Sequence, residues 1–199
     1  MTARTTRAIL ILSAFVVGLA LTFGVIVLVA GRSGGPMTGQ VASVGGPFRL
    51  VDGNGKPVTD QDMKGKPFLV FFGFTHCPEV CPTTLFEVSE VLRKLGPDAD
   101  KAAALFITVD PERDTPAVMK DYLANFDPHL RGLTGSREQI EPVLKSYRVY
   151  SQKVPLDGGG YTMDHTALVY LMDKQGRFVA PFNVKRSADA AAADLRKHL

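Results

Sequence analysis

The sequence predicts an α/β domain, with a central mixed sheet flanked by helices, preceded by a single N-terminal transmembrane helix. A continuous apolar run at residues 68–72, and largely apolar segments at 105–109 and 166–171, are typical of strands buried on both faces of a sheet. Segments with apolar residues at helical spacing lie between these runs. Strands that alternate with helices indicate βαβ units around one central sheet.

The N-terminal segment at residues 8–30 is apolar and contains no charged residue. Its length is enough for a helix to span the hydrocarbon core of a bilayer, which is about 30 Å thick. A cleavable signal peptide is the alternative, but the apolar core of such a peptide has only about 7–15 residues. We therefore expect an uncleaved transmembrane anchor over residues 8–30.

The charges around this anchor predict its orientation. Arg4 and Arg7 precede the apolar run and only Arg32 follows it closely, so the positive-inside rule places residues 1–7 in the cytoplasm. Residues 31–44 are rich in Gly and Ser and should form a flexible tether. Residues 45–199 should then form one domain, and we expect a bacterial inner-membrane protein with this domain in the periplasm.

The charge of the predicted domain argues against nucleic acid as a partner. The net charge of the whole chain is +3, and the three arginines before residue 36 account for it. The rest of the chain has equal numbers of basic and acidic residues, 20 of each, and no basic stripe. Such a neutral domain lacks the positive surface that phosphate backbones require.

The first half of the domain should contain a hairpin, the buried strand at residues 68–72 and a helix. Residues 48–51 and 57–59 flank the strong turn signal Asp52-Gly53-Asn54-Gly55, which predicts the hairpin. Pro82 fits the first turn of the helix, where a missing N–H is tolerated. Gly96-Pro97 should end that helix.

The second half should continue the alternation of helices and strands after the strand at residues 105–109. Thr115 should cap one helix, with Pro116 in its first position, and Asp114 is expected only to contribute to that cap. Ser136 and Gln139 form a capping box for a second helix. The remaining predicted elements are strands at 131–133, at 149–154 on a sheet edge, at 166–171 and at 178–182, and a helix from residue 187 onward.

The only two cysteines, Cys77 and Cys81, lie between the first buried strand and the helix that follows it. A cysteine pair in this place is the thioredoxin-like arrangement, so we expect a thioredoxin-like fold. A structural disulfide is the default for an extracytoplasmic domain, but a bridge between residues four apart closes too short a loop to stabilise much. Redox exchange and metal binding both need the thiolate, which the start of a helix should favour.

His165 is the third predicted metal ligand. It directly precedes the buried strand at residues 166–171, in a loop that can approach the cysteine loop of a thioredoxin-like sheet. Two thiolates and one imidazole suit Cu(I), or Cu(II) with an added ligand, whereas a structural zinc ion would require a fourth protein ligand. Asp110, which follows a strand, and Asp164, beside His165, are expected around the ligand set rather than in it.

Three motifs occur together in the domain: FFGFTHCPEVCPTTL at residues 71–85, VDPERDTP at 109–116 and YTMDHTALVYLMD at 161–173. Together they resemble the Sco/SenC family of copper-binding proteins of respiratory oxidase assembly. The resemblance implies a thioredoxin-like domain on the outer face of the membrane, with copper held by Cys77, Cys81 and His165. It also implies delivery to the CuA centre on subunit II of cytochrome c oxidase, with an upstream copper donor and a thiol reductant as further partners.

Two classes of function follow from these residues. In a metallochaperone, Cys77, Cys81 and His165 bind copper and pass it to acceptor thiolates, without turnover of a substrate. In a thiol-disulfide oxidoreductase, the two cysteines are a catalytic redox pair that reduces the CuA-site cysteines of subunit II or serves redox signalling. The imidazole favours the metallochaperone, because a pure dithiol exchanger does not need His165.

Overall fold

The structure is a computed structural model that describes residues 15–27 and 44–199, and the chain divides into two compact units, Met1–Ala42 and Ser43–Leu199. In the first unit, residues 15–27 form a helix with mostly exposed side chains. The remainder of the predicted anchor, the predicted cytoplasmic segment 1–7 and tether residues 31–43 lie outside the described residues. Within the described part of the chain, no helix combines the length and the apolar character needed to cross a membrane.

The second unit contains a seven-stranded mixed sheet with strand order β2-β1-β5-β4-β3-β8-β9. Three parallel strands form its centre: β3 (Phe68–Gly73), β4 (Ala103–Thr108) and β5 (Leu130–Thr134). Antiparallel strands flank them on both sides: β1 (Arg49–Asp52), β2 (Pro57–Thr59), β8 (Val169–Met172) and β9 (Phe178–Pro181). All six residues of β3 are buried, which explains its continuous apolar sequence.

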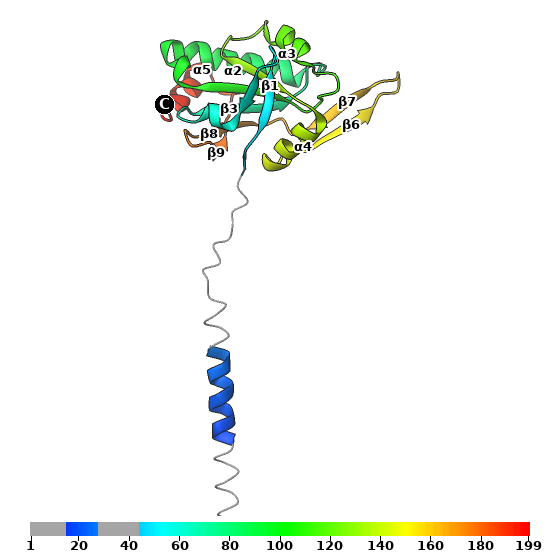
Figure 1. The fold of residues 1–199 in the computed structure, drawn as a ribbon. Helices are drawn as coiled ribbons and strands as arrows, with labels where there is room; N and C mark the ends of the chain where they lie inside the picture. The colour runs from blue at the N-terminus through cyan, green and yellow to red at the C-terminus, as the bar shows by residue number, and fades with distance from the viewer. Residues whose placement is uncertain (1–14, 28–43) are drawn as a thin grey trace, which may run out of the picture. The chain divides into compact units, whose positions relative to one another are not determined.

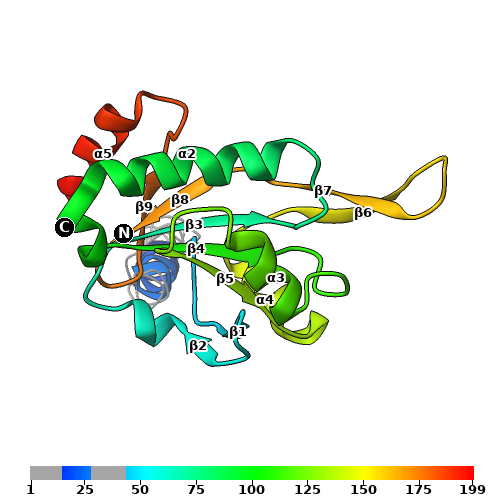
Figure 2. The ribbon, with the colours of Figure 1, turned by 90° about the horizontal axis from the view of Figure 1, so that it is seen from above.

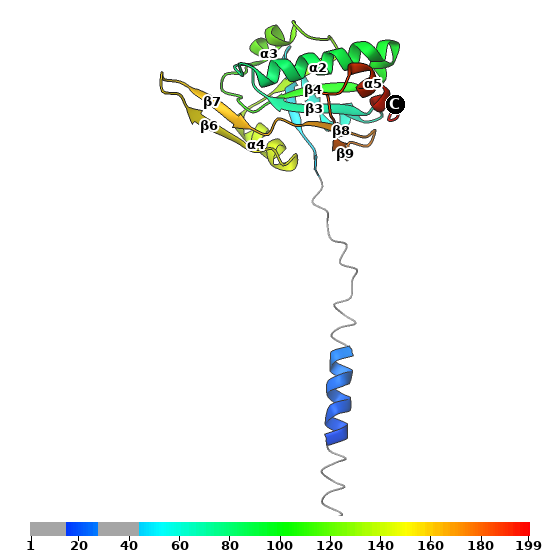
Figure 3. The same ribbon diagram turned by 180° about the vertical axis from the view of Figure 1, so that it is seen from behind.

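Helices cover both faces of this sheet, as Figures 1 and 3 show from opposite sides. On one face lie α2 (Val80–Leu95), α3 (Pro116–Leu123) and α5 (Ala188–Arg196), and on the other lies α4 (Arg137–Ser146). The second unit also contains two 3-10 helices, η1 (Asp60–Met63) and η2 (Gly96–Lys101). The predicted α/β class, with a mixed central sheet between helices, is confirmed.

Local sequence signals set most of the helix ends. Thr115 caps α3 by accepting a hydrogen bond from the backbone N–H of Val118, at 3.3 Å. Ser136 and Gln139 form the predicted capping box of α4. Gly96 ends α2 with φ of 58°, a left-handed conformation that glycine adopts without steric cost.

Strands β6 (Ser151–Pro155) and β7 (Tyr161–His165) form a separate two-stranded sheet. The strand predicted at residues 149–154 is present as β6 with shifted bounds, but its one partner is β7 and it does not join the central sheet. Figure 2 shows the resulting hairpin extending away from the central sheet. Glycines at its tip, Gly159 and Gly160, have φ of 87° and 78° and allow the chain to reverse.

The two loops that matter for the site leave the central sheet side by side. Gly73 at the end of β3 is in register with Thr108 at the end of β4. Because both strands run parallel, residues 74–79 and 109–115 emerge at the same edge, where open α/β sheets place their sites.

Candidate metal centre

The cysteine loop places the two thiols at different depths. Cys81 is the second residue of α2 and is fully buried, whereas Cys77 in the loop is half-buried. Both cysteines are free thiols, and the backbone N–H of Cys81 donates a hydrogen bond to Sγ of Cys77 at 3.4 Å. The first turn of the helix therefore holds Cys77 against Cys81.

Gly73 provides the space that the Cys81 thiol occupies. A Cβ atom added at Gly73 would lie 2.7 Å from Sγ of Cys81 and 2.7 Å from a ring carbon of Phe106. Such distances are well inside van der Waals contact. The last residue of β3 therefore has to be small for Cys81 to sit in its observed position.

His165, the last residue of β7, reaches the buried thiol. Its Nε2 lies 3.7 Å from Sγ of Cys81, and its Nδ1 lies 3.0 Å from the carbonyl oxygen of Thr166. This contact assigns the proton to Nδ1 and leaves the Nε2 lone pair directed at the thiol. The rings of Phe74 and Phe71 pack edge-on against the imidazole, with centroids 5.7 and 6.5 Å away.

Burial, rather than the helix start, decides the charge state of this pair. Burial raises the pKa of the Cys81 thiol well above its usual value, although a backbone hydrogen bond from Phe74 opposes the shift. The expectation that the helix start favours a thiolate is therefore wrong for Cys81. Burial also lowers the pKa of His165, against the opposing effects of the Thr166 carbonyl and Asp164. At neutral pH the contact joins a thiol to a neutral imidazole.

The separation of these two donors fits a shared metal ion. Bonds of about 2.3 Å to sulfur and about 2.0 Å to nitrogen, at angles of about 110–120°, put sulfur and nitrogen about 3.5–3.7 Å apart. The observed distance is 3.7 Å, and the donors are soft, as copper prefers. Among residues 15–27 and 44–199, no three His, Cys, Asp or Glu side chains are already gathered around one metal position.

Asp114 fixes the cysteine loop through hydrogen bonds with Thr75. Its position before α3 in the sequence does not indicate this role. Its buried carboxylate accepts hydrogen bonds from the Thr75 hydroxyl and the Thr108 hydroxyl, each at 2.6 Å, and from the Thr75 backbone N–H at 3.2 Å. The cap of α3 is supplied by Thr115 instead. Burial raises the pKa of Asp114 above its ordinary value, although the hydrogen bonds from Thr108 and Thr75 oppose the shift.

The other predicted residues lie around these groups in different ways. Asp110 is buried and accepts hydrogen bonds from Arg113 Nε at 2.5 Å and from the Tyr161 hydroxyl at 2.9 Å, so it contacts the hairpin near its turn. Asp164 is exposed next to His165. His76 is half-exposed and bonds to Thr75 rather than to a cysteine.

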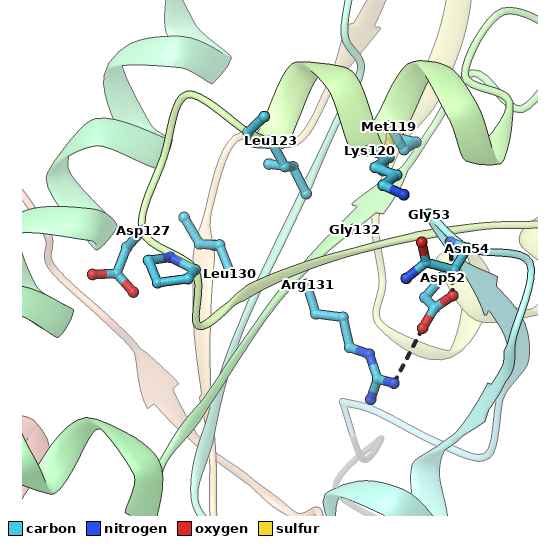
Figure 4. Close-up of a pocket in the computed structure, with 12 residues that line it drawn as sticks. Asp52, Gly53, Asn54, Met119, Lys120, Leu123, Asp127, Leu130, Arg131 and Gly132 are labelled. Atoms are coloured by element: carbon cyan, nitrogen blue, oxygen red, sulfur yellow. Dashed lines mark hydrogen bonds and ion pairs between the residues drawn. The ribbon is translucent and has the colours of Figure 1, made fainter.

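A mixed polar and apolar pocket of about 350 Å³ lies elsewhere in the domain, between α3, β5 and the turn after β1 (Figure 4). Arg131 and Asp52 form an ion pair of 3.2 Å at its wall. None of the three predicted ligands lines this pocket.

Comparisons with known proteins identify the family of this chain. The SCO1/SenC family model matches residues 36–199. A solved structure of Bradyrhizobium japonicum ScoI with copper bound is 66% identical, with a TM-score of 0.77, and the match covers 79% of this chain and all of that one. A structure of BsSco, described as a member of the Sco family of cytochrome c oxidase assembly proteins, is 26% identical, with a TM-score of 0.64, and covers 78% of this chain and 94% of that one.

Mitochondrial proteins are also similar. The SCO2 homolog of Mus musculus is 42% identical over 162 residues, which are 79% of this chain and 64% of that protein. The chain thus spans about half to two thirds of the curated relatives it matches first, since the match covers 49% of the Arabidopsis thaliana SCO1 homolog 1.

Proposed function

Because this chain belongs to the SCO1/SenC family, we propose that it is a copper metallochaperone of cytochrome c oxidase assembly. It binds copper through Cys77, Cys81 and His165 and delivers the metal to the CuA site of subunit II. The observation that carries this proposal is the 3.7 Å contact between Sγ of Cys81 and Nε2 of His165. Copper bound to a relative that is 66% identical supports the choice of metal.

The geometry gives each ligand a distinct part in the handling of copper as cargo. His165 is neutral, and its Nε2 atom contacts the Cys81 thiol, whereas its Nδ1 atom contacts the Thr166 carbonyl oxygen. The lone pair of Nε2 is therefore available to bind copper. Cys81 must lose its proton when metal binds, because burial keeps it a thiol. Cys77 is the more accessible sulfur and the one that incoming acceptor thiolates can displace first.

The proposal includes a membrane anchor at residues 8–30, with residues 1–7 in the cytoplasm, residues 31–44 as a tether and the domain in the periplasm. The uncharged sequence and the exposed apolar side chains of the helix at residues 15–27 support it. An acceptor domain that is itself bound to the outer face of the membrane would then lie within reach of the tether. An upstream copper donor and a thiol reductant are the further partners.

A second candidate function is thiol-disulfide exchange, which the unequal burial of the cysteines favours. Cys77 as thiolate attacks a sulfur of a partner disulfide and releases one partner thiolate, which takes up a proton. The Cys81 thiol then loses its proton and its sulfur attacks the Cys77 sulfur, while the second partner thiolate leaves and takes up a proton. The partner gains two electrons and two protons, and this chain ends with a Cys77–Cys81 disulfide.

His165→Ala separates the two functions. The variant of the full-length reduced protein should lose Cu(I) affinity by at least tenfold, because one of three ligands is missing, yet its cysteines should still oxidise to a disulfide. A competition titration with a chromophoric Cu(I) chelator measures the affinity, and mass spectrometry of alkylated thiols measures the disulfide. His129→Ala is the control, since His129 bonds to Asp127 and Asp100 away from the site. Equal Cu(I) affinity in wild type and His165→Ala would rule out the three-ligand site.

Transfer itself distinguishes delivery from reduction. Copper-loaded protein mixed with apo subunit II whose cysteines are already reduced should produce the absorption of the CuA centre. If copper-loaded protein gives no such absorption, and the CuA centre forms only when subunit II with an oxidised cysteine pair receives the reduced metal-free protein together with free copper, thiol exchange is the better account.

A further inference from the structure

The β6–β7 hairpin bears His165, yet it has no strand pairing with the central sheet. Its position against the domain therefore depends on side-chain contacts, and several of these lie near the turn, at the opposite end of the hairpin from His165. Tyr161, the first residue of β7, makes several of these contacts, all with the loop that follows β4. This loop contains Asp110 and Arg113.

Arg113 joins the hairpin to that loop. Its Nε donates to the Asp110 carboxylate at 2.5 Å, and its NH1 donates to the backbone oxygen of Tyr161 at 2.9 Å. The guanidinium carbon lies 3.8 Å from the centroid of the Tyr161 ring, and the Tyr161 hydroxyl donates a hydrogen bond to the Asp110 carboxylate at 2.9 Å. The three side chains thus form a closed set of charge-assisted and cation–π contacts.

The same guanidinium also faces the cysteine loop. It lies 5.8 Å from the ring centroid of Phe74, and that ring packs edge-on against the imidazole of His165 at 5.7 Å. Phe74 is almost fully buried, the Asp110 side chain is completely buried, and the Arg113 side chain is only 24% exposed. Solvent therefore weakens these contacts little.

We propose that Arg113 is a positioning residue, which latches the hairpin through Tyr161 and Asp110 and so holds His165 against Cys81. The inference rests on the proposed copper site and deepens it, because it names what fixes the third ligand. Without the latch the hairpin would keep its own pairing but swing more freely at its base. His165 would then spend less time within reach of the two sulfurs.

The first test needs no metal. Hydrogen exchange of the full-length protein in detergent, followed by mass spectrometry, should show faster exchange in peptides covering residues 161–165 of Arg113→Met and Tyr161→Leu. Peptides of β3 should stay protected as in wild type. Arg131→Met is the matched control, because it removes an arginine–aspartate pair of 3.2 Å at a remote site. Unchanged exchange at residues 161–165 in both latch variants would overturn the proposal.

The second test is a double-mutant cycle on copper affinity. Arg113→Met and Tyr161→Leu should each weaken Cu(I) binding by about 10- to 100-fold, the usual effect of removing a group that orients a ligand. In the His165→Ala background neither change should weaken binding further, because the ligand that the latch positions is gone. Additive losses in the double variants would show a general structural effect and contradict the proposal.

Two features keep the test decisive. Arg113→Met leaves the buried Asp110 carboxylate without its cation, which can prevent folding. If that variant does not fold, the result for Tyr161→Leu tests the proposal alone, because this variant keeps the Asp110–Arg113 pair. If His165→Ala alone binds copper like wild type, the proposed function fails. If His165→Ala loses affinity but Tyr161→Leu binds like wild type, only the latch fails.

Discussion

Single residues decide the shape of the proposed metal centre, and Gly73 does so by having no side chain. The prediction for Gly73→Ala is that Cys81 and Phe106 must both shift, because the new Cβ would lie 2.7 Å from each. Overpacking of this kind costs about 1–3 kcal/mol of unfolding free energy. We also expect weaker Cu(I) binding, since the Cys81 sulfur moves relative to His165, as a chelator competition titration would report.

Gly132→Ala is the matched control for this change. A Cβ at Gly132 would lie 2.6 Å from Leu123 and 3.1 Å from Met119, in the wall of the pocket, which neither cysteine lines. It should destabilise the domain to a similar extent and leave Cu(I) affinity unchanged. Equal losses of affinity in both variants would mean that Gly73 has no special part in placing Cys81.

Asp114 gives a second prediction at this scale. Asp114→Asn keeps the shape but replaces one acceptor oxygen with an NH₂ group, so one of the donors from Thr75 or Thr108 loses its partner. We expect a loss of about 1–3 kcal/mol in urea unfolding and faster hydrogen exchange at the Thr75 amide. Asp52→Asn, in a remote turn, should not change exchange at Thr75. Protection of that amide equal to wild type in Asp114→Asn would contradict the role of Asp114.

At the scale of elements, the connection between α3 and β5 is tied to its neighbours by a histidine. The imidazole of His129 lies 2.7 Å from the Asp127 carboxylate and 3.3 Å from that of Asp100 in η2. The hydrogen bond to Asp127 raises the pKa of His129, with burial opposing the shift and Asp100 adding to it. The folded protein therefore binds this proton more tightly than the unfolded chain does.

The sign of this shift predicts how the contact depends on pH. Its stabilisation is fully present below the unfolded pKa of about 6.5 and is lost as pH rises through the higher folded pKa. The unfolding free energy of wild type should exceed that of His129→Gln more at pH 5.5 than at pH 8.5, as measured by urea titration. Asp127→Asn should shrink this pH dependence. A difference between wild type and His129→Gln that grows toward pH 8.5 would refute the assignment.

At the scale of the whole molecule, the domain has a core of its own. The unit Ser43–Leu199 contains the central sheet, its helices and all three proposed ligands. We expect residues 44–199, expressed alone, to fold cooperatively and to bind one copper ion with the affinity of the full chain. Circular dichroism during thermal unfolding and a Cu(I) titration measure both. A disordered or aggregated product would show that the preceding residues take part in folding.

The sequence by itself determined the fold class and the identity of the candidate ligands. Apolar runs predicted the buried strands because a strand covered on both faces must be apolar throughout, and Thr115, Ser136 and Gly96 predicted helix ends because capping is local. The two cysteines and His165 were chosen for their chemistry and their places beside predicted strands. These signals depend on neighbours along the chain, so no tertiary structure is needed to detect them.

Only the tertiary structure decided how the site is supported. The support of Thr75 by Asp114 and the contact of Arg113 with Tyr161 join residues far apart in sequence. The pairing of β6 with β7 away from the central sheet, and the space that Gly73 leaves for Cys81, depend on how the domain packs around them. The charge of Cys81 was mispredicted for the same reason. The helix start is visible in the sequence, but the burial that outweighs it depends on the packing of the whole domain.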